Sequence, residues 1–206
     1  MEKHFIIISD QMVQLAGEAG DIAFNQGNYE KALIWYDKGL QFTSPKSNVY
    51  GNLIYAKADA VFQLGRYQEA LRLLTKFEDE LSSHSLKSKA LFYAGDIYKI
   101  MSEVSSNPTE KQKYMQKACE VYEQVINSEI DITNLELIKN ALLEKGRCEK
   151  QLGRMEQALA DFRSIIANYP NTRHAVDAEL EIGDYSFTAK QYSKAIQSFE
   201  RAVELA

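Results

Sequence analysis

Proline, glycine and cysteine are scarce in this chain. Its 206 residues include only 3 Pro, 10 Gly and 2 Cys, beside 12 Tyr and 9 Phe. So few breakers leave little room for long irregular loops, which disfavours a disordered chain and a β-sandwich with its many turns. Cys119 and Cys148 form no Cys-x-x-Cys pair, and two cysteines are too few for a disulfide framework or a cysteine zinc site. We expect two buried, reduced thiols.

Positive charge is not in excess either. The chain has 24 Lys and Arg against 29 Asp and Glu, a net charge of −5, which disfavours a dedicated nucleic-acid binder. No stretch approaches the roughly 18 apolar residues of a membrane span, and the apolar run Phe5–Ile8 is too short for a secretory signal. These absences predict a soluble, cytoplasmic protein, or a periplasmic one if a signal has been removed.

Signatures of catalysis are also missing. The sequence contains no Walker-type phosphate loop, no Gly-x-Gly-x-x-Gly, no Gly-x-Ser-x-Gly and no His-Glu-x-x-His. Its histidines, His4, His84 and His174, are too far apart in sequence to pair as metal ligands on one helix. The densest acidic run, Glu78–Glu80, is typical of a solvated helix end. We therefore predict a non-enzymatic protein with no cofactor and no metal; an enzyme would need a catalytic domain outside these 206 residues.

What the chain does contain is an internal repeat. A small residue recurs with spacings of 38, 37, 51 and 37, at Gly20, Ala58, Gly95, Gly146 and Gly183. An alanine follows twelve residues later in four units and 23 later in the third, which therefore carries 11 extra residues. These alanines are Ala32, Ala70, Ala118, Ala158 and Ala195. Four residues past them lie the bulky side chains Tyr36, Leu74, Tyr122, Phe162 and Phe199.

Spacings of three and four are those of one buried helix face. Gly27, Gly65 and Gly153 fall between the two helical patterns of their units, where a left-handed residue ends a helix with little strain. Each unit is thus predicted as a helix, a tight turn and an antiparallel helix, and the units share a core by stacking.

Three polar clusters predict helix starts. Ser44 with Pro45 is read as an N-cap and first helical residue. Asn107 with Pro108 is read the same way, so the 11 extra residues are expected to lengthen a second helix from about 108 to 128. The capping box Thr133–Glu136 places another helix start near 134.

The windows Asn28–Tyr36 and Gln191–Phe199 resemble the tetratricopeptide repeat (TPR) family, in which an alanine precedes an aromatic residue by four positions. The resemblance implies an all-α fold, a right-handed α–α superhelix (TPR solenoid) of about five helix-turn-helix repeats. The expected repeats are 13–46, 51–84, 88–130, 134–172 and 173–206, after a lead-in segment 1–12 whose run Phe5–Ile8 packs on the first helix pair. The usual large residue of the first helix is replaced by Ala16, Ile54, Leu91, Leu142 and Glu179.

The resemblance also implies a protein-interaction scaffold that binds a partner peptide or helix in a concave groove lined by the first helices. The residue after each small anchor is acidic in four units and Arg147 in the fourth unit, and aromatic residues lie near it. A partner with apolar anchors and a few Lys or Arg would suit such a surface, although a polar residue there also suits plain exposure to solvent. The predicted binding residues are Asp21, Phe24, Tyr55, Asp59, Phe62, Phe92, Tyr93, Asp96, Arg147, Asp184 and Phe187.

The sequence also bears on three other kinds of association. TPR modules that hold the C-terminal tails of Hsp70 and Hsp90 carry a basic clamp, and the matching positions here are Gly17, Asp21, Ala56, Lys89 and Tyr93, which argues against such tails. An alternative is a self-associating solenoid, a homo-oligomer formed through a last repeat that has no polar capping helix. Another is a regulatory TPR fragment of a larger protein, because Tyr169–Thr172 and the residues after it resemble repeats of bacterial envelope-assembly proteins.

Overall fold

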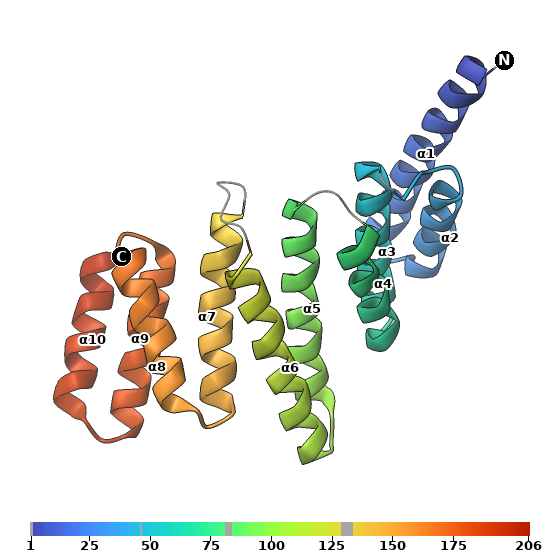
Figure 1. Cartoon of the computed structure of the whole chain (residues 1–206). Helices are drawn as coiled ribbons and strands as arrows, with labels where there is room; N and C mark the ends of the chain where they lie inside the picture. Colours follow the sequence, from blue (N-terminus) through green and yellow to red (C-terminus); the bar gives the residue numbers. More distant parts are fainter. Residues whose placement is uncertain (1, 46, 81–83, 129–133) are drawn as a thin grey trace. The chain divides into compact units, whose positions relative to one another are not determined.

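The structure is a computed structural model that describes the backbone of residues 2–45, 47–80, 84–128 and 134–206, and the side chains of 10–45, 47–75, 86–128 and 134–206. Within these ranges there are ten helices and no strand (Figure 1). They are α1 (Glu2–Asn25), α2 (Tyr29–Leu40), α3 (Asn48–Gln63), α4 (Tyr67–Glu80), α5 (His84–Val104), α6 (Pro108–Ile126), α7 (Leu135–Gln151), α8 (Met155–Asn168), α9 (Arg173–Thr188) and α10 (Tyr192–Leu205). The predicted all-α fold class is confirmed.

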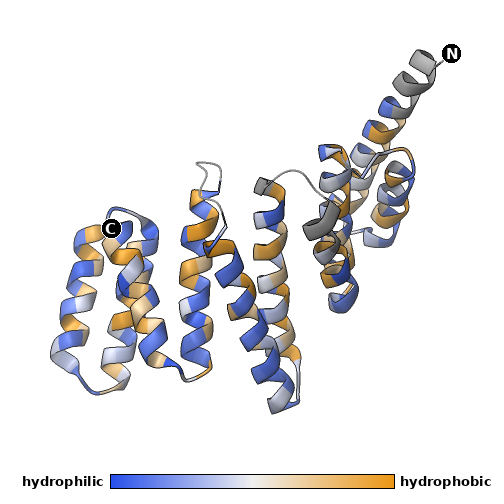
Figure 2. Cartoon of the chain, in the orientation of Figure 1, coloured by the Kyte–Doolittle hydropathy of each residue, from blue (hydrophilic) through white to orange (hydrophobic). Residues whose placement is uncertain are grey.

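The chain divides into two compact units inside α5, which we call unit 1 (residues 1–97) and unit 2 (residues 98–206). In unit 1, α1 packs on α2, α2 on α3, and α3 on α4. In unit 2, α6 packs on α7 and the order continues pair by pair to α10. Hydrophilic residues interrupt the apolar ones along the coloured helices of Figure 2. Among the described residues, no helix is both long enough and apolar enough to cross a membrane.

The same tight turn closes four of the helix pairs. Gly27, Gly65 and Gly153 have φ values of 75°, 73° and 76°, as the sequence predicts, and Lys190 takes the equivalent place with φ 59°. In all four turns the next residue donates its backbone N–H to the carbonyl five residues earlier, as Asn28 does to Ala23 at 2.9 Å. This Schellman bond satisfies carbonyls left open at the helix end. The sequence did not predict the left-handed backbone of Lys190, because glycine is the residue type that usually indicates this conformation.

The small anchors lie where the two helices of a pair approach most closely. A Cβ atom added to Gly20 would lie 2.3 Å from a ring carbon of Tyr36, and one added to Gly146 would lie 2.6 Å from Phe162. Real Cβ atoms do not approach so closely, so these rings occupy the space that a side chain would need. In the second pair the anchor is the buried Ala58 and the bulky residue is the smaller Leu74. Where the anchor residue is larger, the residue four positions past the alanine of the second helix is smaller.

The third pair accommodates its 11 extra residues in both helices. The helix after the anchor Gly95 runs to Val104, four residues further than in the other pairs, and α6 begins seven residues earlier relative to Ala118. Asn107 Oδ1 caps α6 by accepting from the backbone N–H of Thr109 at 2.9 Å. The long second helix is confirmed, but the expectation that it alone takes up the insertion is wrong, because extending only one helix would leave its partner without a matching turn.

The predicted start of α3 is also wrong. Ser47, not Ser44, is the N-cap, and its Oγ accepts from the backbone N–H of Val49 at 3.1 Å. Pro45 instead follows Ser44 in a turn that is closed by a 2.9 Å hydrogen bond from Ser47 N–H to Ser44 O. Proline suits the second position of a turn as well as the first turn of a helix. Phe5–Ile8 and the capping residue Thr133 fall outside the residues whose side chains are described.

The two cysteines are free and buried, as predicted, on α6 and α7. A hydrogen bond with Cys119, together with burial, raises the pKa of the Cys148 thiol well above its usual range. Because the thiolate is the reactive form, both residues behave as core side chains.

Gly146→Ala is expected to lower the free energy of unfolding by about 1–3 kcal/mol, the usual result of overpacking a filled core. Its added methyl would collide with the ring of Phe162. Adding Phe162→Leu should recover part of the loss, because it reproduces the Ala58 and Leu74 pairing of unit 1. Urea unfolding followed by circular dichroism measures both effects.

Gly17→Ala is the matched control. Its added methyl would meet Leu53 Cδ2 at 3.6 Å, an ordinary contact, and alanine favours a helix over glycine by about 1 kcal/mol. We expect no loss of stability. Equal destabilisation by the two glycine replacements would contradict the role assigned to the anchor.

Candidate functional site

Two of the predicted acidic residues are held by tyrosine hydroxyl groups in unit 1. Asp21 and Asp59 directly follow the anchors of α1 and α3, so they point about 100° away from the helix-pairing contact. Asp21 Oδ1 accepts from the Tyr36 hydroxyl and Asp59 Oδ1 from the Tyr93 hydroxyl, each at 2.8 Å. Among the described residues, no cation is paired with either carboxylate.

A cavity of about 310 Å³ connects these acids with aromatic rings. Four predicted binding residues line it, namely Asp21, Phe24, Tyr55 and Asp59. Asn25, Tyr36 and Ala56 also line it and were not predicted. Tyr36 was interpreted as core, and its side chain is indeed buried. The feature of the sequence that could have identified Tyr36 as a residue of this site is its hydroxyl group, since a buried tyrosine needs a polar partner.

The aromatic rings continue from this cavity along α3 and α5 within unit 1. The centroids of Tyr55 and Tyr93 are 5.5 Å apart, and those of Phe62 and Tyr93 are 5.6 Å apart. All three rings are half-buried, so part of each remains accessible to solvent. We call Asp21, Phe24, Tyr55, Asp59, Phe62 and Tyr93 the aromatic–acidic surface.

The electrostatics of this surface keep its tyrosines neutral. Burial, followed by the hydrogen bond with Asp59, raises the pKa of Tyr93 far above its usual range. Burial, followed by the charges of Asp59 and Asp96, raises the pKa of Tyr55. Asp96 is therefore near both rings, and Phe92 is half-buried on the same helix. The tyrosines remain hydrogen-bond donors, and no cation from the described part of the chain is paired with Asp21 or Asp59.

One of the two equivalent positions of unit 2, Arg147, is paired within the unit. Arg147 forms ion pairs with Glu144 at 2.7 Å and Glu181 at 2.8 Å, and Lys150 binds Glu181 at 2.7 Å. Lys99 also pairs with Glu144. Burial opposes ionisation of Glu181, but these ion pairs outweigh it and lower the pKa of its carboxyl group. Repeat alignment could have found this network, because Glu144 and Glu181 stand 37 residues apart at one repeat position.

The other two predicted binding residues are exposed on α9 of unit 2. Asp184 lies open to solvent, and Phe187, which is 60% exposed, packs its ring edge against Tyr192. The eleven predicted residues thus divide between the units, with Arg147, Asp184 and Phe187 in unit 2 and the rest in unit 1. A single groove through all of them stays a prediction.

Among the described residues, no group of three or more His, Cys, Asp or Glu side chains is arranged to hold a metal ion. The His174 ring is buried and hydrogen-bonded to Asn140 at 2.8 Å, and burial lowers its pKa. Its burial and its hydrogen bond make it a packing histidine.

Comparison with known proteins agrees with the helix pairs. Tetratricopeptide repeat models match residues 13–44, 140–172 and 180–206. A MamA protein structure has a TM-score of 0.66 at 16% identity, over 95% of this chain and 92% of that chain. PilF of Pseudomonas aeruginosa has a TM-score of 0.65 at 16% identity, over 96% and 78%. YrrB, a TPR protein with an unusual peptide-binding site, has a TM-score of 0.59 at 16% identity, over 92% and 84%.

No curated protein sequence matches the chain. The models identify tetratricopeptide repeats in these three segments, and the structural likeness shows the all-α superhelix fold predicted for the chain. Proteins with this fold are generally non-enzymatic scaffolds that bind proteins or peptides.

Glu181→Gln is expected to lower the free energy of unfolding at pH 7 by about 1 kcal/mol, because two half-exposed cations lose their partner. The folded-state pKa of Glu181 is lowered, so its contribution is complete above the unfolded-state pKa of about 4.3 and is lost as the pH falls through the folded value. The difference from the wild type should therefore shrink in acid. Urea unfolding between pH 3 and 7 measures it.

Glu200→Gln, at an exposed position of α10, serves as the control and should leave the pH dependence unchanged. Identical acid profiles for Glu181→Gln and the wild type would show that the ion pairs contribute nothing.

Proposed function

We propose that this TPR protein binds, on the aromatic–acidic surface of unit 1, a partner peptide or helix that carries apolar side chains and at least one Lys or Arg. The observation that carries the proposal is the cavity in which Asp21 and Asp59 lie beside aromatic rings, with no cation from the described residues paired to them. The partner would supply that cation.

The chemistry of the cavity suits one long basic side chain. Each carboxylate accepts one tyrosine hydroxyl and keeps further acceptor positions free. Aromatic rings next to the carboxylates attract a cation through their faces. A volume of about 310 Å³ is at the small end of ligand pockets, so it holds a side chain while the rest of the segment contacts the rings of Phe62 and Tyr93.

The contrast with unit 2 supports this choice of surface. There Arg147, at the same repeat position as Asp21 and Asp59, is already paired with Glu144 and Glu181, so a partner that used this charge would have to break these pairs. In unit 1 the described groups that compete for Asp21 and Asp59 are uncharged, namely the hydroxyl groups of Tyr36 and Tyr93 and the Gln63 side-chain amide, which donates to Asp59 Oδ1 at 3.4 Å.

Peptides selected from a random displayed library on the wild-type chain provide the probe. Those that bind unit 1 should be rich in Lys, Arg and large apolar residues. Asp21→Asn combined with Asp59→Asn should weaken them about tenfold or more, because charge-assisted hydrogen bonds are lost. Titration calorimetry at two salt concentrations should also show a smaller salt dependence for the variant.

Two controls separate charge from structure. Asp184→Asn removes an aspartate of the same repeat position in unit 2 and should leave the affinity unchanged. Tyr93→Phe removes the hydroxyl group that competes for Asp59, so binding should be equal or tighter. Undiminished affinity in the folded double aspartate variant would refute the proposed use of this surface.

A second candidate function is self-association through the last repeat, and the exposed side of α10 favours it. Tyr192, Ile196 and Val203 are 55%, 58% and 78% exposed. Their spacings of four and seven residues place them on one side of the helix. Neighbouring exposed apolar residues mark contact surfaces.

This function requires a wild type that self-associates. Ile196→Glu combined with Val203→Glu is expected to convert it to the 23.5 kDa monomer, as measured by sedimentation velocity or light scattering. Ile34→Glu, at a position of α2 that is 57% exposed, is the control and should not change the mass. A wild type that stays monomeric at high concentration would exclude this function.

A further inference from the structure

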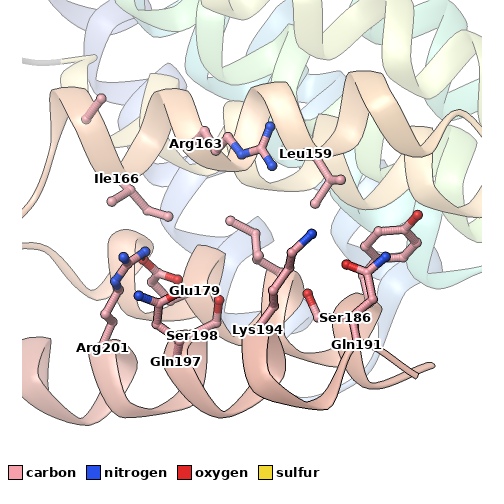
Figure 3. A pocket seen from close by; sticks show the side chains of 13 residues that line it. Leu159, Arg163, Ile166, Glu179, Ser186, Gln191, Lys194, Gln197, Ser198 and Arg201 are labelled. Carbon is pink, nitrogen blue, oxygen red and sulfur yellow. The ribbon is translucent and has the colours of Figure 1, made fainter. Parts of the chain in front are cut away.

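A second and larger hollow lies within unit 2, between α8 and α10 and above α9. Its volume is about 580 Å³ (Figure 3). The side chains that define it are Leu159, Arg163 and Ile166 from α8, Glu179 from α9, and Lys194 and Arg201 from α10. We call it the α8–α10 groove. It is separate from the aromatic–acidic surface, which belongs to unit 1.

The groove exists where the repeat departs from its own pattern. Glu179 occupies the first-helix position that holds Ile54, Leu91 and Leu142 in the three preceding repeats. Leu142 is part of the apolar core beside Phe162. A carboxylate cannot join such a core without loss of hydration, so this position does not fill the space between α8 and α10 with apolar atoms.

Glu179 is nevertheless buried, with 3% of its surface exposed. Its Oε1 lies 3.8 Å from Nη1 of Arg201, which reaches across from α10. Leaving a carboxylate at this depth costs stability unless it is paired and hydrogen-bonded. The packing of unit 2 does not require a carboxylate at Glu179, because Leu142 occupies the same position one repeat earlier.

The rims of the groove are positively charged. Arg163 and Lys194 are exposed on the two facing helices, and neither has an ion pair among the described residues. In Figure 3, Lys194 and Arg201 extend from one helix toward the opposite helix that carries Leu159, Arg163 and Ile166. Three cations and one carboxylate give the lining a net charge of +2, in a chain whose net charge is −5.

We propose that the α8–α10 groove binds an acidic segment of a partner protein. Two carboxylates of the segment bind Arg163 and Lys194, and an apolar side chain between them contacts Leu159 and Ile166. Charge complementarity selects an acidic partner, and Glu179 repels acids from the floor, so the acids bind at the rims. This partner is opposite in charge to the one proposed for unit 1.

The lining disfavours a nucleic acid as the occupant. Nucleic-acid binding relies on many phosphate contacts, about 6–10 for a typical site, whereas only Arg163 and Lys194 are unpaired here. A buried carboxylate on the floor would also repel a phosphate backbone. Leu159, Ile166 and Ile182 offer apolar contacts that a protein segment uses and a phosphate backbone does not.

The test selects random displayed peptides on the wild-type chain and discards those that still bind the Arg163→Glu/Lys194→Glu variant. The remaining peptides should pair Asp or Glu with Leu, Ile or Phe. Their Kd should rise about tenfold or more in this variant, since charge-assisted contacts become repulsive. Lys31→Glu/Arg72→Glu, an equal charge change at exposed positions of α2 and α4, should change the Kd less than threefold.

Glu179→Leu gives a second, independent readout. It restores the side chain that Leu142 provides one repeat earlier, so the free energy of unfolding should rise. It also removes the carboxylate that repels acids from the floor, so the selected acidic peptides should bind as tightly as before or more tightly. If the double charge reversal fails to fold, Arg163→Gln/Lys194→Gln takes its place in the same assay.

Several outcomes would overturn the proposal. The selection could leave no peptide, or the selected peptides could be basic. A mixed-sequence single-stranded oligonucleotide could also bind as tightly as the peptides and lose its binding in the Arg163→Glu/Lys194→Glu variant. A wild-type dimer that Arg163→Glu/Lys194→Glu converts to a monomer would identify a second copy as the occupant instead. None of these results depends on Asp21 or Asp59, so failure here leaves the proposed function of unit 1 standing.

Discussion

The contact between a small residue on the first helix and a bulky one on the second underlies every other feature of this protein. The ring of Tyr36 lies against Gly20, and the ring of Phe162 lies against Gly146, at distances that exclude a Cβ atom. This contact fixes how the helices of a pair are rotated about their axes. The next residue along, Asp21 or Arg147, is thereby rotated about 100° from the anchor position and becomes available for a polar role, as Asp21 does in accepting from the Tyr36 hydroxyl.

The two units use that available position differently. In unit 1 the carboxylates of Asp21 and Asp59 accept hydrogen bonds from tyrosine hydroxyl groups, and no described cation is paired with them. In unit 2, Arg147 lies between Glu144 and Glu181, and the charges cancel locally. The last repeat then introduces a third arrangement, in which Glu179 occupies a core position and a cationic groove opens beside it. One repeat pattern thus carries three distinct electrostatic surfaces, because surface side chains can change while the anchor contact persists.

Most of the fold was predictable because it rests on short-range periodicity. The anchors, the alanines and Gly27, Gly65 and Gly153 each have one structural explanation, and all were predicted. The errors fell where a residue type permits two local structures: Pro45 fits both a turn and a helix start, and a lysine adopted the left-handed turn at Lys190. For the site, the sequence identified Asp21, Phe24, Tyr55 and Asp59, which do line one cavity. It missed Tyr36, since a core position and a hydroxyl role can coincide in one tyrosine.

The sequence by itself determined the helix pairs, their antiparallel packing and the resemblance to tetratricopeptide repeats, because these follow from spacings of three, four and about 37 residues along the chain. Only the tertiary structure decided which charges are paired. Whether Glu181 meets Arg147 and Lys150, or whether Arg163 and Lys194 face each other over a buried carboxylate, depends on side chains from different repeats. Such contacts leave no periodic signal, since any one of these residues would be an ordinary solvated charge on a single helix.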